Sequence, residues 1–350
     1  METHSYYMYR EILQEPQTVA RTVEAELENV REIVRIVRAR EIEYVLIAAR
    51  GTSDNAAQFA KYLFEVINGV PGSLAAPSIY TVYRASLKSL RRALVLGISQ
   101  SGEGLDIVEV VKAAREGGAL TVGLTNNRSS ALARTAEHVI VGCAGEEKSV
   151  AATKTYTAQL VALLMLSLEW AGREDLFGGL RQVPGQIEQT LGLEARIKSV
   201  VARYRYMNDC VVLGRGFNYS TALEAALKIK ETCYVGSQPY SSADFLHGPI
   251  AVVEEGFPAF VIAPPGKAFP SVLGVVEELV KRKAEVVAIT SDPGLLEMAT
   301  IPLQVPVEVD ETLSPLIYVV PMQLFAYHLA LTKGLDPDQP RGLTKVTRTL

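Results

Sequence analysis

The chain alternates short, continuously apolar runs with longer segments in which apolar residues recur every three or four positions. Continuous runs are typical of strands buried on both faces of a parallel sheet, and the longer period is typical of helices. The alternation predicts an α/β fold in which a doubly wound parallel sheet is flanked by helices. The first half predicts helices over 10–40, with a break or start near Pro16, over 53–67 and over 155–172, and strands over 44–49, 78–83, 93–98, 120–125 and 139–143.

The same pattern starts again after residues 177–192, whose glycine and proline content predicts a domain boundary. A helix over 193–207 leads to the apolar run 210–216, so that VLGRGFN corresponds to IAARGTS of the first half. We infer an internal duplication. In it, the run 259–266 stands where ALVLGISQSG stood, and the run 284–291 stands where ALTVGLTN stood. We expect a helical segment over 1–40, subdomains over 41–180 and 190–332, and an extended tail over 333–350.

Composition narrows the class of protein. The 350 residues suffice for two domains with sizeable cores, and the net charge of −4 does not favour nucleic acid or an acidic membrane surface as a partner. No run of 18 uncharged apolar residues and no signal-peptide pattern is present, so we predict no membrane association. The cysteines (Cys143, Cys210 and Cys233) are unpaired by spacing, which predicts small buried side chains in a reducing, cytoplasmic protein.

Hydroxyl and amide side chains gather in three loops that lead into predicted helices. In open α/β sheets, ligands bind beyond the carboxyl ends of the strands, where helix N-termini favour anions. Each loop alone is equally typical of a helix cap, but three together favour a phosphate site. Neither GxGxxG nor GxxxxGK[ST] is present, so the loops do not predict a dinucleotide or a nucleoside triphosphate. The candidate ligands are Thr52, Ser53, Ser99, Gln100, Ser101 and Thr153.

Several motifs in a fixed order carry a resemblance to a known family. They are MYREILQEPQTV, RGTS (50–53), SQSGE (99–103), SVAATKTYTAQL (149–160), LGRGFNYSTALEAALKIKET (213–232), HGP (247–249) and PMQLFAYHLALTKGLDPDQPRGLTKV (321–346). Through them the chain resembles the sugar isomerase (SIS) family. Within it, the chain is most similar to the isomerase half of glucosamine-6-phosphate synthase and to its stand-alone deaminase and deglycase relatives.

The resemblance implies two SIS subdomains that bind a phosphosugar through the six candidate ligands, without a cofactor. It implies that Glu231 is the base that moves a proton between C1 and C2, with Lys228 near the sugar. It further implies that His247 opens the sugar ring from the neighbouring subunit of a homodimer, and that Lys345 of the tail forms a Schiff base with an open-chain ketose.

The residues themselves allow plainer interpretations. Lys228 and Glu231 are three apart and share a helix face, so alone they would be a surface ion pair worth less than roughly 1 kcal/mol. His247 precedes Gly-Pro and is expected on a turn, where it could equally cap a carbonyl. Lys345 could be a solvated tail lysine. The other histidines (His4, His138 and His328) form no cluster with acids or cysteines at ligand spacing, so we predict no metal.

Three departures from the family pattern bear on the substrate. Gly104 and Ala152 stand where relatives commonly carry hydroxyl side chains, and Leu246 stands where they carry lysine. Losing two hydroxyls frees space, which favours a bulkier substrate. The sequence begins at the isomerase half, so we expect that glutamine is not the nitrogen donor.

The expected activity is therefore deamination of glucosamine-6-phosphate to fructose-6-phosphate and ammonia. The alternatives are a fructosamine-6-phosphate deglycase and a plain sugar-phosphate isomerase. A SIS module that senses a sugar phosphate is the non-enzyme alternative, and a sensor would not need the candidate base, Glu231.

Overall fold

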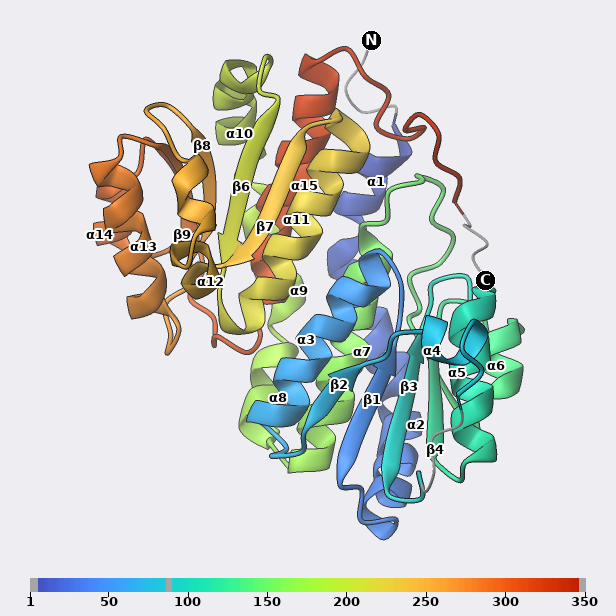
Figure 1. Cartoon of the computed structure of the whole chain (residues 1–350). Helices are drawn as coiled ribbons and strands as arrows, with labels where there is room; N and C mark the ends of the chain where they lie inside the picture. Colours follow the sequence, from blue (N-terminus) through green and yellow to red (C-terminus); the bar gives the residue numbers. More distant parts are fainter. Residues whose placement is uncertain (1–5, 86–89, 346–350) are drawn as a thin grey trace. The chain divides into compact units, whose positions relative to one another are not determined.

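The computed structural model describes residues 6–85 and 90–345. It contains two five-stranded sheets, whose strand pairs are all parallel (Figure 1). The described chain divides into two compact units. Of the described residues, the first unit holds those of 17–147 and 154–181 with residues 343–345, and the second holds residues 182–342 with 148–153 and 6–16.

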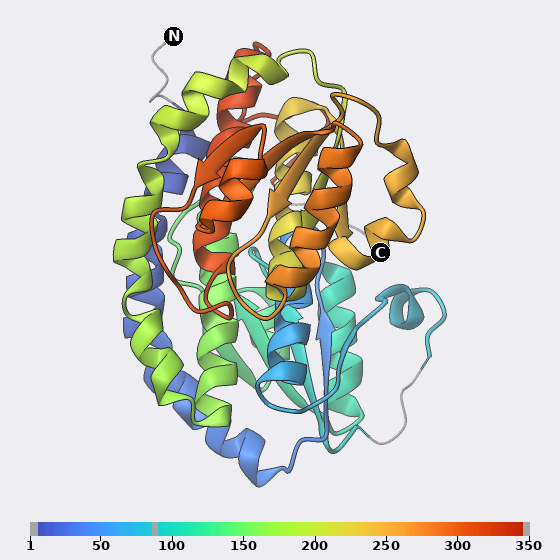
Figure 2. The ribbon, with the colours of Figure 1, turned by 90° about the vertical axis from the view of Figure 1, so that its left-hand side faces the viewer.

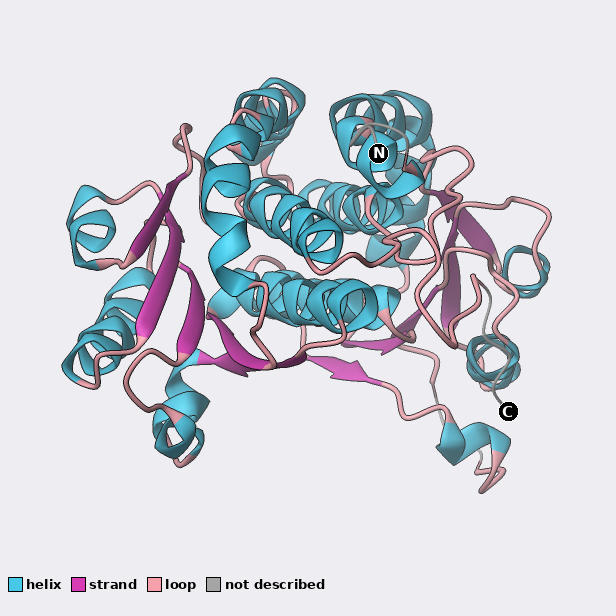
Figure 3. Cartoon of the chain, turned by 90° about the horizontal axis from the view of Figure 1, so that it is seen from above, coloured by secondary structure: helices cyan, strands magenta, loops and turns pink. Residues whose placement is uncertain are grey.

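The first sheet has the order β2-β1-β3-β4-β5. Every residue of β3 and β4 is buried, as the continuous apolar runs predict. Leu46 and Val95 pack into one core with Ile107 and Val110 of α5, whereas alternate strand residues face the opposite side. Figure 3 shows helices on both faces of the sheets. The strands are β1 (Tyr44–Ala48), β2 (Gly72–Leu74), β3 (Ala93–Ile98), β4 (Leu120–Thr125) and β5 (His138–Val141), and the helices that follow them include α3 (Thr52–Val66), α5 (Leu105–Glu116), α6 (Ala131–Thr135) and α7 (Lys154–Ala171).

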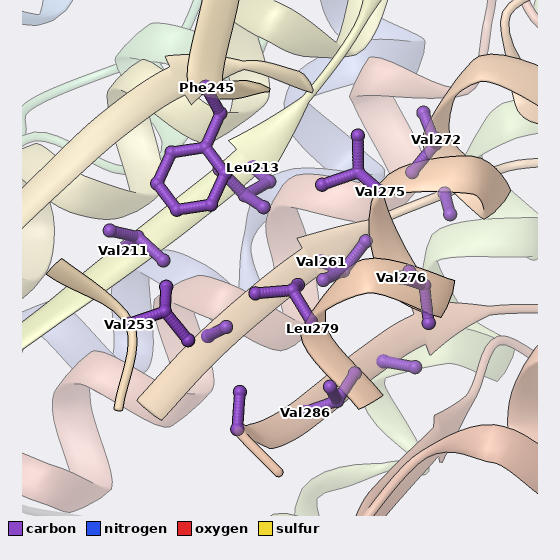
Figure 4. Close-up of a cluster of buried hydrophobic side chains, with 14 of the residues drawn as sticks. Val211, Leu213, Phe245, Val253, Val261, Val272, Val275, Val276, Leu279 and Val286 are labelled. Carbon is purple, nitrogen blue, oxygen red and sulfur yellow. The ribbon is translucent and has the colours of Figure 1, made fainter. Parts of the chain in front are cut away.

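The second sheet has the order β10-β9-β8-β6-β7. Valine and leucine side chains of β6, β8 and β9 pack against one face of α13, with Phe245 of α12 closing the cluster (Figure 4). Helices α11 and α15 pack against each other. The strands are β6 (Asp209–Gly214), β7 (Gly236–Ser241), β8 (Pro258–Ile262), β9 (Glu285–Thr290) and β10 (Ile301–Gln304), and the helices are α10 (Glu194–Val201), α11 (Tyr219–Cys233), α12 (Ser242–Leu246), α13 (Phe269–Lys281), α14 (Pro293–Met298) and α15 (Pro315–Thr332).

The two sheets have the same topology. In each, the first strand in sequence lies between the second and the third, and the fourth and fifth follow outward from the third. β1 and β6 are therefore equivalent first strands, as the duplication predicts.

The segment 78–83 does not form the predicted strand. It forms the short helix α4 (Ser78–Thr81), drawn in cyan in Figure 2, and the second strand is β2, which precedes it. Only Tyr80 reaches the core, while Val82 and Tyr83 are exposed. A strand gains its stability from packing its side chains on a sheet, and β-branched composition does not supply that packing.

The segment 10–40 is helical and broken near Pro16, as the sequence predicts. It is split into α1 (Tyr7–Leu13) and α2 (Glu15–Ala39), with the break just before Pro16. The glycine- and proline-rich stretch forms α8 (Glu174–Leu180) and α9 (Val183–Leu191), since a proline at the start of a helix costs it no hydrogen bond.

Helix α15 is long and apolar enough to cross a membrane by length and composition alone. However, 89% of it is buried inside the structure, which is the pattern of a core helix. Such a helix in the core of a soluble protein passes the same length and composition test.

Candidate functional site

The loop between β3 and α5 is shaped by its own serines. Ser99 Oγ accepts a hydrogen bond from the Gly102 N–H at 3.2 Å, and Ser101 Oγ accepts one from the Glu103 N–H at 3.2 Å. Helix α5 begins later, after Gly104, and no side chain caps it. The helix-cap interpretation is therefore wrong for both serines, which leave their hydroxyls on a partly exposed loop ahead of the helix.

Gly102 is required by this loop. Its φ is +66°, and a Cβ built on it would lie 2.1 Å from Ser130 Oγ. The close approach lets the loop fold back beside the start of α6, so the SQSG turn has one well-defined backbone path.

The hydroxyls of α3 play different parts. Thr52 is the first residue of the helix and is half-buried, directly after Gly51, whose φ is +56°. Ser53 is buried and its Oγ accepts a hydrogen bond from Gln159 Nε2 of α7 at 2.9 Å. Ser53 therefore contributes to packing between two helices, and Thr52 is the better placed of the two to meet a ligand.

Thr153 is fully buried and immediately precedes α7. Its segment is held by Glu11 of α1, whose carboxylate accepts hydrogen bonds from the N–H groups of Lys148 and Ser149. A buried carboxylate that receives two backbone donors fixes the path of the residues that carry them.

A second buried carboxylate, which the sequence analysis missed, joins two predicted site residues. The side chain of Glu147 has no exposed surface, and its Oε2 lies 2.9 Å from Gln100 Nε2 and 2.9 Å from Lys345 Nζ. Its Oε1 accepts a hydrogen bond from the Thr155 N–H at 3.1 Å. The tail lysine and the amide of the serine loop therefore meet on one oxygen atom within the first unit.

In the second unit, α11 presents a buried lysine between two glutamates. Lys228 Nζ lies 2.6 Å from Glu231 Oε2 and 3.4 Å from Glu224 Oε1. The exposed fractions are 1% for Lys228, 0% for Glu224 and 23% for Glu231. The shared helix face is confirmed, and the surface ion-pair interpretation is wrong because the ammonium is buried. The sequence motifs did not single out Glu224, although it lies four residues before Lys228 on the same helix face.

His247 lies where the sequence predicts a turn. It is the C-cap of α12 and is exposed, its N–H donates to Asp244 O at 3.0 Å, and Gly248 follows with a φ of +130°. No hydrogen bond or ion pair joins the His247 ring to another of the described residues. Within its own unit the structure does not bring it to the α11 cluster by such a contact.

The tail that carries Lys345 is anchored before it reaches that residue. Asp338 accepts hydrogen bonds from the N–H groups of Tyr7 and Met8, each at 2.7 Å. The Arg341 N–H donates to Tyr234 OH at 2.8 Å, and the Arg341 guanidinium lies over the Tyr234 ring. These contacts fix residues 338–341 without helix or strand.

Burial explains the cysteines. Cys210 and Cys233 are buried, and burial raises the pKa of each thiol to about 12. The prediction of buried side chains is confirmed for these two, whereas Cys143 is half-buried. Across residues 6–85 and 90–345, no three His, Cys, Asp or Glu side chains are grouped so that they could hold a metal ion.

A comparison with models of known protein families identifies the family of this chain. The model of the SIS domain matches the chain twice, over residues 40–168 and 207–333. The chain belongs to the SIS domain family. The two matches contain the two sheets, so the inferred duplication corresponds to two SIS repeats, as the resemblance implies.

Individual relatives agree with this assignment. The glutamine–fructose-6-phosphate aminotransferase (isomerizing) of Methanothermobacter thermautotrophicus is 38% identical over 344 residues, which are 98% of this chain and 57% of that protein. The C-terminal domain of glucosamine-fructose-6-phosphate aminotransferase from Francisella tularensis has a TM-score of 0.86 at 28% identity, covering 96% of this chain and 99% of that domain. A candidate phosphosugar isomerase from Silicibacter pomeroyi DSS-3 has a TM-score of 0.86 at 33% identity, over 95% and 100% of the two chains.

The chain thus spans little more than half the length of the curated relative. It is homologous to the isomerase half of that enzyme.

Proposed function

We propose that this SIS protein is an aldose–ketose isomerase that deaminates an amino-sugar phosphate, with glucosamine-6-phosphate as the substrate. The observation that carries the proposal is the α11 cluster. A carboxylate held 2.6 Å from a buried ammonium, with about a quarter of its own side chain exposed, has a fixed position and access to a ligand. A general base needs both a fixed position and access to the proton that it removes.

The chemistry needs two proton transfers and one hydrolysis. Glu231 removes the proton from C2 of the open-chain aldose and returns it to C1, while a second proton passes from the amine nitrogen to the C1 oxygen. The C1 aldehyde thus becomes a hydroxymethyl group and C2 becomes an imine. Water then adds to the imine, and ammonia leaves. Glucosamine-6-phosphate and water thus give fructose-6-phosphate and ammonia. Lys228 beside the carboxylate stabilises negative charge that develops on the substrate oxygen during the transfer.

The remaining candidate residues have supporting roles in the proposal. Thr52, Ser99 and Ser101 bind the phosphate through hydroxyl and backbone donors. His247 transfers the proton that opens the sugar ring, and Lys345 binds the ketose carbonyl. We propose a homodimer, because the family resemblance implies that His247 comes from a second subunit. We also propose a cytoplasmic location, because the cysteines are free thiols.

The deglycase is the second candidate function, and Gly104 favours it. A glycine in the serine loop leaves space for a larger substrate. A plain isomerase would use the same base without releasing an amine. A sensor has no use for a base beside a buried ammonium, so the α11 cluster argues against a purely regulatory role.

Substitution of Glu231 by glutamine tests the proposal. The amide keeps the shape of the side chain but cannot accept the C2 proton, so turnover is expected to fall by about two to four orders of magnitude. Binding of the phosphosugar, measured by its effect on the melting temperature, is expected to persist. Glu278→Gln, which changes an exposed glutamate of the same unit, is the matched control. Unchanged turnover in Glu231→Gln would remove this residue from the mechanism.

A further inference from the structure

We infer that Glu147 is a positioning residue that places Lys345 of the tail and the amide of Gln100 at one point beside the serine loop. The inference rests on the proposed function for the role of Lys345, but the contacts themselves are properties of the first unit. Neither the family match nor the sequence motifs assign a role to this carboxylate.

Glu147 collects donors from three separate segments. Gln100 lies in the loop after β3, Thr155 lies in the first turn of α7, and Lys345 lies in the tail, 47, 8 and 198 residues away along the chain. The Gln100 amide and the Lys345 ammonium both approach Oε2 at 2.9 Å. One oxygen atom therefore sets the distance between the tail and the loop.

Burial makes this arrangement obligatory. An ionised carboxylate without exposed surface is strongly destabilising unless charged and polar donors surround it, and Glu147 receives a cation, an amide and a backbone N–H. The same argument applies from the side of the tail. Lys345 is only about a quarter exposed, and its ammonium pairs with the Glu147 carboxylate. Without that carboxylate, the ammonium would lose the ion pair that holds it at Oε2.

The electrostatics also suit a carbonyl-binding lysine. If Lys345 joins a ketose carbonyl, its nitrogen gives up a proton, attacks the carbonyl and expels the carbonyl oxygen as water. The ammonium and the carbonyl overall give an iminium ion and one water, so reactant and product carry the same positive charge. Glu147 faces that charge before and after the step without itself gaining or losing a proton. It therefore acts through Lys345 and need not touch the substrate.

The first test needs no substrate. Lys345 is expected to react several-fold more slowly with acetic anhydride than exposed Lys283 in the native wild-type chain, as measured by mass spectrometry of peptides. Glu147→Gln removes the ion pair and is expected to bring the two rates together. Glu146→Gln changes an exposed neighbour and is expected to leave the ratio of the rates as in the wild type. Equal acetylation of Lys345 and Lys283 in the wild type would overturn the inference, whatever the substrate proves to be.

The second test is a double-mutant cycle in turnover. Glu147→Gln is expected to lower kcat by about 10²-fold, the cost of misplacing a reacting group by about an ångström, with a much smaller change in KM. In a Lys345→Met background the same substitution is expected to cost less than about threefold, because its main effect passes through the missing ammonium. An equal cost in both backgrounds would overturn the inference. Glu147→Asp, which keeps the charge, is expected to restore part of the loss.

The two proposals fail separately. If Glu231→Gln remains fully active while Lys345 is protected, the proposed base is wrong and the role of Glu147 stands. If Glu231→Gln is inactive and Lys345 is as reactive as Lys283, only the role of Glu147 is wrong.

Discussion

Gly104 is a position at which the chain could carry a side chain and does not. Its φ of −66° suits any residue, and a Cβ there would meet only ordinary contacts, the nearest being Asp106 Oδ1 at 3.5 Å. Gly102, two residues earlier, has a positive φ and no room for a Cβ. The backbone therefore requires Gly102 but leaves residue 104 open to selection by the substrate.

We predict that Gly104→Thr folds normally and narrows the substrate range. The added methyl and hydroxyl groups occupy space that a larger substrate would need. The ratio of kcat/KM for glucosamine-6-phosphate to that for an N-substituted fructosamine-6-phosphate is expected to rise by about tenfold or more. Gly102→Ala, by contrast, is expected to destabilise the loop. An unchanged ratio in a well-folded Gly104→Thr variant would contradict the proposal that this glycine makes room.

At the scale of elements, one carboxylate joins three helices of the second unit. Glu194 of α10 accepts hydrogen bonds from Tyr9 OH of α1 at 2.9 Å and pairs with Lys198 Nζ at 2.7 Å, while its Oε1 lies 3.0 Å from His328 Nε2 of α15. Burial raises the pKa of Glu194. The hydrogen bonds from Lys198 and Tyr9 and the charge of Lys198 together lower it by a larger amount, so the pKa lies below its ordinary value of 4.5. The ionised form therefore stabilises the fold.

The lowered pKa of Glu194 determines how the stability contribution of this residue changes as the pH falls. Since the folded-state value is depressed, the contribution of Glu194 is present above pH 4.5 and is lost as the pH falls through the folded-state pKa. We predict that Glu194→Gln melts at a lower temperature than the wild type at neutral pH, and that the difference shrinks as the pH is lowered toward about 3. Thermal melts across this range measure it, with exposed Glu277→Gln as a surface control. A difference that does not change with pH would contradict the argument.

The sequence correctly predicted those elements in which every residue is buried. The runs 93–98 and 120–125 are buried at every position, so their composition determines their structure, and they match the observed strands residue for residue. The segment 78–83 has the same kind of composition but a mixed environment, with one buried tyrosine and several exposed apolar side chains. The local pattern of residues could not show that the segment 78–83 pairs with no strand of the described sheets.

The candidate site was predictable only where the geometry of one helix brings its residues together. Lys228 and Glu231 meet because a helix places them on one face, and that rule would also have found Glu224. Glu147 meets Lys345 across 198 residues, and no spacing in the sequence signals this contact. The roles of His247 and Lys345 rest on the family resemblance, because a turn and a tail have no pattern that indicates chemistry.

At the scale of the whole chain, the two repeats have kept one topology and have diverged at their loops. The loop after β3 in the first repeat presents serine hydroxyls. In the second repeat, the corresponding loop before α13 is occupied by a carboxylate of the chain itself. Glu311 accepts hydrogen bonds from the N–H groups of Lys267 and Ala268 at 2.7 and 3.1 Å. An anion would compete there with a fixed negative charge, which favours phosphate binding in the first repeat alone.

The central claim is that this chain moves a carbonyl from C1 to C2 of an amino-sugar phosphate, and product analysis tests it most directly. The purified chain is incubated with glucosamine-6-phosphate, and ammonia and fructose-6-phosphate are measured in the same sample. The account predicts that both appear in equal amounts and that Glu231→Gln abolishes both. If neither product appears although glucosamine-6-phosphate raises the melting temperature, the chain binds this sugar without transforming it, and the account is contradicted.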